Sequence, residues 1–426
     1  MSLKPEARGE TVERLIADLS SMFFMKDFVF RSPSYLTSGS KRQVTDLMFL
    51  LGSECILVSV KGTDGSEKAP QRLSLWADKK ARQTSKNAKT ACQRAANLEI
   101  TATNLWEETR VFPAGVLNPI CGLGLVECSQ EMFKPIRFTL PQTGPVYPIH
   151  CLSANDFLNV VLWLGSIWDV FNYFKLRGQV SHLFRGINEE RPLVCYYTLR
   201  SHGDFSGFVK EDRERLSELH QLFLIDTLPK YAERDRFASV VNAVIHRLHE
   251  WDQNFESYAP SELKHLIEPI DKRSAYLAMA ARLNSLPMSN KAWIGQEIQD
   301  GIERAKKTGQ SSCFLYKQLL GHVVFVFAIF TKFTRTDKIR ALNTFLPAAQ
   351  YSSGQPEALG VAYDADDENI GFEICWRRGP IEDHESVRTL AARLFPGSLE
   401  TWSPTPFGEL RPYQPKGQRV DSEPRS

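Results

Sequence analysis

Apolar residues recur with two different periods along the first hundred residues of the chain. Two strand-length apolar runs, Leu47–Leu51 and Cys55–Val58, flank Gly52-Ser53, a pattern typical of a β-hairpin with a two-residue turn. Residues 77–98 contain no Gly or Pro and are rich in Ala, Lys and Arg, which predicts a long helix. Helically spaced apolar positions predict an amphipathic helix at residues 11–23: Val12, Leu15, Ile16, Leu19 and Phe23.

Shorter elements are predicted around these three. A strand at Phe28–Phe30 is followed by a loop that contains Pro33 and Gly39, and LSLW (73–76) has the composition of another strand. Residues 100–150 alternate apolar runs with prolines, which indicates further strands and loops. The order helix, strand, hairpin, strand, helix therefore predicts an α/β fold with a mixed sheet flanked by helices.

The pattern becomes helical after residue 150 and mixed again after residue 310. The most hydrophobic stretch, residues 157–174, carries Asn159, Asp169 and Asn172 and predicts a buried helix rather than a membrane span. Later elements are predicted as a strand at 323–330, a helix at 337–347, a linker at 351–357, a hairpin from ALGVAY and GFEICWR, and a helix at 384–395. We therefore expect an α/β domain at 1–150, a mainly helical region at 151–310, a small C-terminal α/β segment at 311–400 and a disordered tail at 401–426.

The composition is ordinary for a globular protein that can bury a core. The chain has 426 residues, is 42% hydrophobic and 24% charged, and carries a formal charge of +2, which neither requires nor excludes a nucleic-acid partner. The eight cysteines show no CxxC spacing and no zinc-type cluster with histidine, so we expect reduced thiols and a cytoplasmic location. The N-terminal residues contain no apolar signal segment, and we expect no membrane association.

Three polar residues mark the open end of the predicted hairpin. A two-residue turn at Gly52-Ser53 places Asp46 opposite Ser59, and alternation along the strand puts Lys61 on the same face. A carboxylate beside a lysine suits metal-assisted phosphodiester chemistry, because one or two carboxylates commonly hold Mg²⁺ and a lysine can orient water or stabilise charge on the phosphate. A structural ion pair between Asp46 and Lys61 is the alternative interpretation.

This layout resembles the PD-(D/E)xK, or restriction-endonuclease-like, nucleases. In that family a helix precedes an aspartate at the start of one strand, the next strand ends acid-x-Lys, and another helix follows. Asp46 matches the motif aspartate and Lys61 matches the lysine, and QVTDLMFLLGSECILVSVKG with WADKKARQTSKNAKTACQRA also looks like uncharacterised bacterial proteins. The resemblance covers roughly residues 10–100 and implies a restriction-endonuclease-like fold, Mg²⁺ or Mn²⁺ as cofactor, and DNA as substrate.

Ser59 stands where the family motif has Glu, Asp or Gln, and its neutral hydroxyl is a poor Mg²⁺ ligand. Some nucleases of this fold use a glutamate from the first helix. The resemblance therefore implies Glu13 as a second metal ligand beside Asp46, with Glu10 one turn earlier as the reserve. Glu54 fits less well, because it lies at the hairpin turn.

The long helix at 77–98 carries a basic stripe next to the proposed site. Its members recur at spacings of three, four and three and so share one face: Lys79, Arg82, Lys86 and Lys89. Small residues supply a separate packing face: Thr84, Ala88, Ala91 and Ala95. Such a stripe can position a nucleic-acid backbone, although most are solvated faces.

Three functions stay open from the sequence. The leading hypothesis is a metal-dependent DNA endonuclease in which Asp46 and Glu13 bind the metal, Lys61 acts on the water or the phosphate, and Ser59 is a weak or water-mediated neighbour. The family analogy adds a role in bacterial defence against foreign DNA. The alternatives are a catalytically degenerate module that binds nucleic acid, which Ser59 favours, and a protein-interaction scaffold. A homo-oligomer or an activating partner protein is compatible with each.

Overall fold

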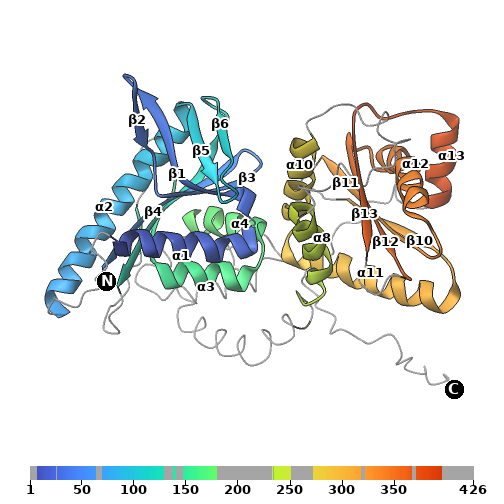
Figure 1. Cartoon of the computed structure of the whole chain (residues 1–426), viewed down its shortest axis with the longest axis horizontal. Coiled ribbons are helices and arrows are strands. Elements are labelled where there is room, and N and C mark those ends of the chain that lie inside the picture. The colour runs from blue at the N-terminus through green and yellow to red at the C-terminus, as the bar shows by residue number, and fades with distance from the viewer. Residues whose placement is uncertain are drawn as a thin grey trace, which may run out of the picture.

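The computed structural model describes residues 7–24, 26–63, 70–128, 138–140, 147–179, 233, 235–250, 272–317, 322–366 and 371–395. Within these ranges the chain forms two α/β halves that lie side by side, each built on its own sheet (Figure 1). The expected class, a mixed sheet flanked by helices, is confirmed. The expected tail at 401–426 lies outside the described residues.

The first half extends to residue 179 and contains one mixed sheet. Nine of the described strands form it in the order β6-β5-β1-β3-β4-β7-β9-β8, with β2 paired to β1. Its elements are α1 (Ala7–Phe24), the 3-10 turn η1 (Lys26–Phe28), β1 (Val29–Thr37), β2 (Ser40–Gln43), β3 (Leu47–Leu51), β4 (Glu54–Thr63), α2 (Pro70–Asn97), β5 (Ile100–Asn104), β6 (Thr109–Phe112), β7 (Asn118–Cys128), β8 (Phe138–Leu140), β9 (Ile149–Ser153), α3 (Ala154–Leu164) and α4 (Ile167–Gln179).

Strand β4 is the internal strand on which the first half is organised. It pairs antiparallel with β3, with Leu47 opposite Val58, which confirms the register predicted from the two-residue turn. On its other edge β4 pairs parallel with β7. Alternate residues of β4 enter two separate cores: Ile56, Val58 and Val60 join residues of α1, α3 and α4, whereas Cys55 and Leu57 join residues of α2.

Helix α2 approaches β7 closely because two glycines in β7 leave room for it. A Cβ at Gly124 would lie 2.7 Å from Thr84 Oγ1, and one at Gly122 would lie 3.0 Å from Ala88 Cβ. The predicted packing face of α2 is confirmed, since all four of its residues are buried: Thr84, Ala88, Ala91 and Ala95. This close packing fixes α2 against the end of β4 that carries Lys61.

The second half contains a four-stranded sheet in the order β10-β11-β12-β13. Its elements are α8 (Ala238–Glu250), α10 (Lys272–Asn284), α11 (Met288–Thr308), β10 (Ser312–Lys317), β11 (Val323–Phe330), α12 (Arg335–Ser353), β12 (Glu357–Asp364), β13 (Phe372–Arg378) and α13 (Glu385–Leu394). The predicted strand at 323–330, the hairpin of β12 and β13 and the last helix are confirmed. The linker expected at 351–357 is wrong, because α12 continues to Ser353 and only three residues separate it from β12.

Three further predictions in the first half are wrong for local reasons. Residues 73–76 lie in α2 rather than in a strand, because the helix begins at Pro70. A run of four residues, three of them apolar, is too short to distinguish a strand from a helix. Pro33 lies in β1 rather than in a loop. The pairing of β1 with β5 shifts in register between Arg31 and Ser34, where Ser32 has a positive φ of 44°. This irregularity resembles a β-bulge, a position at which a strand tolerates proline. The predicted apolar stripe of α1 is confirmed at Val12 and Ile16, which are buried, but is wrong at Leu15, which is 51% exposed.

The two halves share one continuous apolar core. Residues of α3 and α4 belong to the same buried cluster as residues of α8, α10, α11 and β11. Two hydrogen bonds join the halves: Ser166 Oγ donates to Leu286 O at 3.2 Å, and Met288 N donates to Asp169 Oδ2 at 2.7 Å. The expected boundary at residue 150 falls inside β9. In the described ranges, no helix combines the length and the apolar character needed to span a membrane.

We predict that Gly124→Ala lowers the free energy of unfolding by about 1–3 kcal/mol, because the added methyl group overlaps Thr84 in a closely packed layer. Urea unfolding measures this loss. Combining it with Thr84→Ala should cost less than the sum of the two single changes, since the second substitution removes the overlapping hydroxyl. Strictly additive costs would contradict the proposed contact.

Candidate functional site

Asp46 lies half-buried immediately before β3, beside the end of β4. Its backbone N–H donates to Val58 O at 3.1 Å and so continues the ladder between the two strands. Its carboxylate Oδ2 accepts hydrogen bonds from Val60 N at 2.6 Å and from Ser59 Oγ at 3.4 Å. The structure therefore brings Asp46 and Ser59 together, as the register of the hairpin predicts.

The position of Asp46 follows from the unequal lengths of β3 and β4. Strand β4 continues to Thr63, but its pairing with β3 ends where Val58 faces Leu47. The N–H of Val60 would be an unpaired donor on that edge, and the Asp46 carboxylate supplies the acceptor. Gln43 Nε2 donates to the other carboxylate oxygen, Oδ1, at 3.2 Å.

Ser59 and Lys61 lie on the face of the sheet that α2 covers. Alternation along β4 puts them on the side of Leu57, next to Gly124 and Val126 of β7. Ser59 is buried and Lys61 is half-buried. Within the described part of the chain Lys61 forms no ion pair with Asp46, so the alternative interpretation of these two residues as a structural ion pair is wrong.

Glu13 reaches the same end of the sheet from α1, on the opposite face. Its side chain is 14% exposed and its Oε1 lies 3.6 Å from Nε of Arg31 in β1. Burial raises the pKa of the Glu13 carboxyl above its ordinary value, and the negative charge of Asp46 raises it further, while Arg31 opposes both effects. Glu13 and Asp46 are therefore close enough to repel each other.

Two carboxylates that repel each other at a strand end are suited to a divalent cation. Mg²⁺ is commonly held by one or two carboxylates, with water and phosphate oxygens completing its shell. In the described ranges no cluster of three or more His, Cys, Asp or Glu side chains could hold a metal, so the fit depends on Asp46 and Glu13. Lys61 adds a positive charge on the opposite, α2-covered face and forms no ion pair within the described residues.

The other acidic candidates do not join this group. Glu10, the reserve on α1, is exposed. Glu54 at the hairpin turn accepts a hydrogen bond from Lys175 Nζ of α4 at 2.7 Å. Glu54 is therefore paired with Lys175 at the turn of the hairpin, at the other end of β4 from Asp46. This agrees with the prediction that Glu54 fits the metal site less well.

The basic stripe lies on α2, away from the packing face of that helix. Three of its members are exposed and form no ion pair in the described part of the chain: Lys79, Arg82 and Lys86. Lys89 is half-buried and makes further contacts. The stripe and the side chain of Lys61 therefore belong to the same layer of the molecule, on the α2 side of the sheet.

Sequence reasoning missed two residues that contact the candidate ligands: Arg31, which pairs with Glu13, and Gln43, which donates to Asp46. Arg31 could have been found if β1 had been extended through Pro33, because it then lies opposite Leu47, next to Asp46. No periodic pattern marks Gln43, since the chain between β2 and β3 is irregular.

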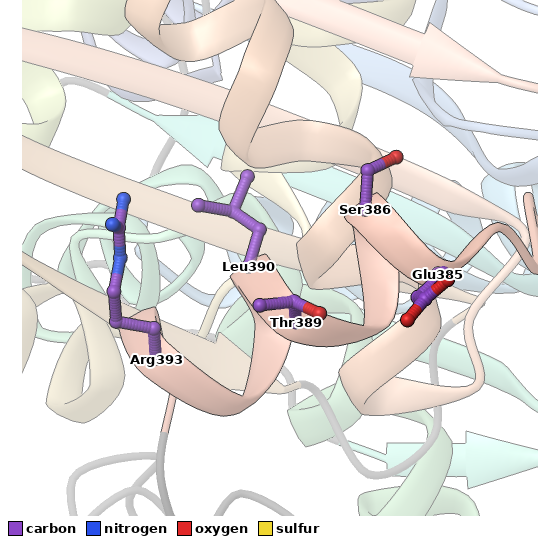
Figure 2. Close-up of a pocket in the computed structure, with 5 residues that line it drawn as sticks. All are labelled: Glu385, Ser386, Thr389, Leu390 and Arg393. Carbon is purple, nitrogen blue, oxygen red and sulfur yellow. The ribbon is translucent and has the colours of Figure 1, made fainter.

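A separate hollow of about 480 Å³ lies on α13 in the second half (Figure 2). One helix supplies its lining: Glu385, Ser386, Thr389, Leu390 and Arg393. The hollow contains none of the residues of the hairpin site. We therefore assign the hollow no part in the chemistry of that site.

Comparison of the chain with protein-family models, with curated proteins and with solved structures finds no match.

We predict that Asp46→Ala lowers the free energy of unfolding by about 1–3 kcal/mol, because it leaves the Val60 N–H without its acceptor. Asp46→Asn keeps a side-chain carbonyl oxygen and should cost clearly less. Urea unfolding of both variants without divalent metal measures the difference. Equal stability of the two variants would show that the Val60 contact contributes nothing.

The raised pKa of Glu13 predicts a pH dependence of stability. A carboxyl whose pKa is higher in the folded state favours folding at pH values below its ordinary pKa of 4.5, and this contribution is lost as the pH rises through the folded value. Glu13→Gln should therefore gain stability relative to wild type between about pH 4 and pH 7. Urea unfolding across this range measures the difference, with Glu303→Gln at an exposed position of α11 as control. A difference between Glu13→Gln and wild type that stays constant with pH would refute the assignment.

Proposed function

We propose that the chain is a divalent-metal-dependent nuclease that hydrolyses DNA phosphodiester bonds. The observation that carries the proposal is the approach of Glu13 to Asp46 at the end of β4, where the charge of Asp46 raises the pKa of Glu13, together with Lys61 two residues beyond Ser59, which forms no ion pair within the described part of the chain. Mutually repelling carboxylates gain most from a shared cation, and an uncommitted lysine is available to an anionic substrate.

Each residue has a separate role in this proposal. Asp46 and Glu13 would hold Mg²⁺ or Mn²⁺, which stabilises charge on a phosphate and lowers the pKa of bound water. Lys61 would orient the attacking water or stabilise the negative charge that develops on the phosphate. Ser59, which donates to Asp46, would hold the carboxylate in position rather than bind the metal directly.

The proposed substrate follows from the surface beside the site. The basic stripe of α2 offers positive charges along one helical face, as binding to a phosphate backbone requires. The order of α1, Asp46 before β3, Lys61 near the end of β4, and α2 also agrees with the layout of restriction-endonuclease-like nucleases. That resemblance supports membership of the family and a role in bacterial defence against foreign DNA, both as proposals.

A second candidate function is a nucleic-acid-binding module of the same fold without catalysis. Ser59 supports this alternative, because the motif position offers a neutral hydroxyl in place of a carboxylate. The Asp46 carboxylate also already accepts three hydrogen bonds, as expected of a structural cap on β4. In this alternative Asp46 stabilises the sheet and the basic stripe holds the nucleic acid.

Cleavage assays with Mg²⁺ or Mn²⁺ on plasmid, linear duplex, single-stranded DNA and RNA test the proposal. We predict that wild type cuts DNA and that EDTA abolishes cleavage. Asp46→Asn, Lys61→Ala and Glu13→Gln should each lower the rate at least roughly a hundredfold, because each removes a charge that acts on the reacting phosphate. Glu303→Gln and Lys306→Ala, which change exposed residues of α11 in the second half, are the matched controls and should retain the wild-type rate.

The alternatives give different results. Salt-dependent binding without cleavage by wild type would support the binding module and overturn the nuclease proposal. Cleavage that survives all three site substitutions would show that the chemistry occurs elsewhere. A protein that neither cuts nor binds any of these substrates would contradict both functions.

A further inference from the structure

A two-stranded ribbon projects from the sheet next to the candidate site. We name residues Ser34–Gln43 the β1–β2 arm, since Ser34 pairs with Gln43 and Thr37 with Ser40. Its two turn residues, Ser38 and Gly39, both have positive φ, at 49° and 77°, as a two-residue turn with the twist of a β-ribbon requires. Figure 1 shows the arm extending beyond β3 at the edge of the first half.

The outer part of the arm, from Leu36 to Gln43, is largely exposed, and the arm carries no acidic residue. No Asp or Glu occurs from Phe28 to Thr45, and all four residues of β2 are exposed. The side chains of Lys41 and Arg42 form no ion pair or hydrogen bond within the described part of the chain. Leu36, opposite Lys41, is 71% exposed. Basic residues on an edge strand also discourage edge-to-edge pairing, but that role does not explain an exposed leucine on the same ribbon.

Fixed contacts tie the arm to both α2 and the candidate site. Tyr35 is buried in the α2-side core, and the Arg94 guanidinium of α2 lies 5.1 Å from the centre of its ring. Arg42 lies directly opposite Tyr35, so it belongs to the α2 side of the ribbon. At the base of the arm, Gln43 Nε2 donates to Asp46 Oδ1. The arm, the basic stripe and Asp46 are therefore held in one arrangement.

We propose that the β1–β2 arm enters the major groove of duplex DNA and positions the adjoining backbone at Asp46 and Lys61. The inference rests on the proposed action on DNA and adds the form of the substrate. The major groove of B-DNA, about 12 Å wide, admits a two-stranded β-ribbon, whereas the major groove of duplex RNA is too narrow and deep for side chains to read. Lys41 and Arg42 suit phosphates or guanine edges, and Leu36 suits the methyl group of thymine.

Fluorescence anisotropy without divalent metal measures binding separately from cleavage. The ligands are a duplex DNA, the same sequence as single-stranded DNA, and a duplex whose cytosines carry glucosylated hydroxymethyl groups on C5, which fill the major groove. Wild type should bind the plain duplex about tenfold or more tightly than the filled duplex. The double variant Lys41→Ala/Arg42→Ala should lose about tenfold in affinity for the plain duplex, with a shallower salt dependence, and should no longer distinguish the two duplexes.

Lys306→Ala/Lys307→Ala is the matched control, because it removes two adjacent exposed charges from α11 in the second half and should bind as wild type does. Equal binding of wild type to the plain and filled duplexes would overturn the inference, and so would an arm variant that binds like the control. Cleavage by wild type in either case would leave the proposed nuclease intact. Groove-dependent binding without cleavage would support the arm and overturn the nuclease.

Discussion

The arrangement of the first half depends on the pairing of β4 with two strands of unequal length. The short strand β3 pairs with one edge of β4, and the longer strand β7 pairs with the other. Because β3 begins only at Leu47, opposite Val58, while β4 continues to Thr63, the N–H of Val60 is left without a partner strand and needs an acceptor. Asp46 meets that need, and the same requirement brings its carboxylate beside Ser59 and within the electrostatic reach of Glu13. The position of Asp46 in the candidate site is therefore determined by the lengths of β3 and β4 as well as by the identity of its residues.

A second constraint fixes the layer that would meet a nucleic acid. Glycines 122 and 124 let the backbone of β7 approach the small residues of α2, so the basic face of the helix must point away from the sheet. The contact between Arg94 and Tyr35 then ties the far end of α2 to the β1–β2 arm. Helix α2, the arm and the end of β4 are thus connected through one sheet.

The sequence predicts those parts of the fold that local chemistry determines. The register of the β3–β4 hairpin follows from its two-residue turn, and β11 follows from an uninterrupted run of eight apolar residues. The approach of Glu13 to Asp46 could be proposed only by family resemblance, because it depends on how α1 packs on the sheet. The contacts of Arg31 and Gln43 were missed, since they depend on a bulged strand and an irregular connection. The exposure of Leu15 likewise depends on which side of α1 meets α3, which helical periodicity alone does not determine.

The continuous core between the two halves has a thermodynamic consequence. Since α3 and α4 pack on the first sheet and also share buried apolar surface with α8, α10 and α11, neither half can open without exposing part of the other. The Ser166–Leu286 and Asp169–Met288 hydrogen bonds cross the same junction. The molecule should therefore melt in a single cooperative transition. A ligand bound at Asp46 would protect the distant second sheet against denaturation as effectively as the first.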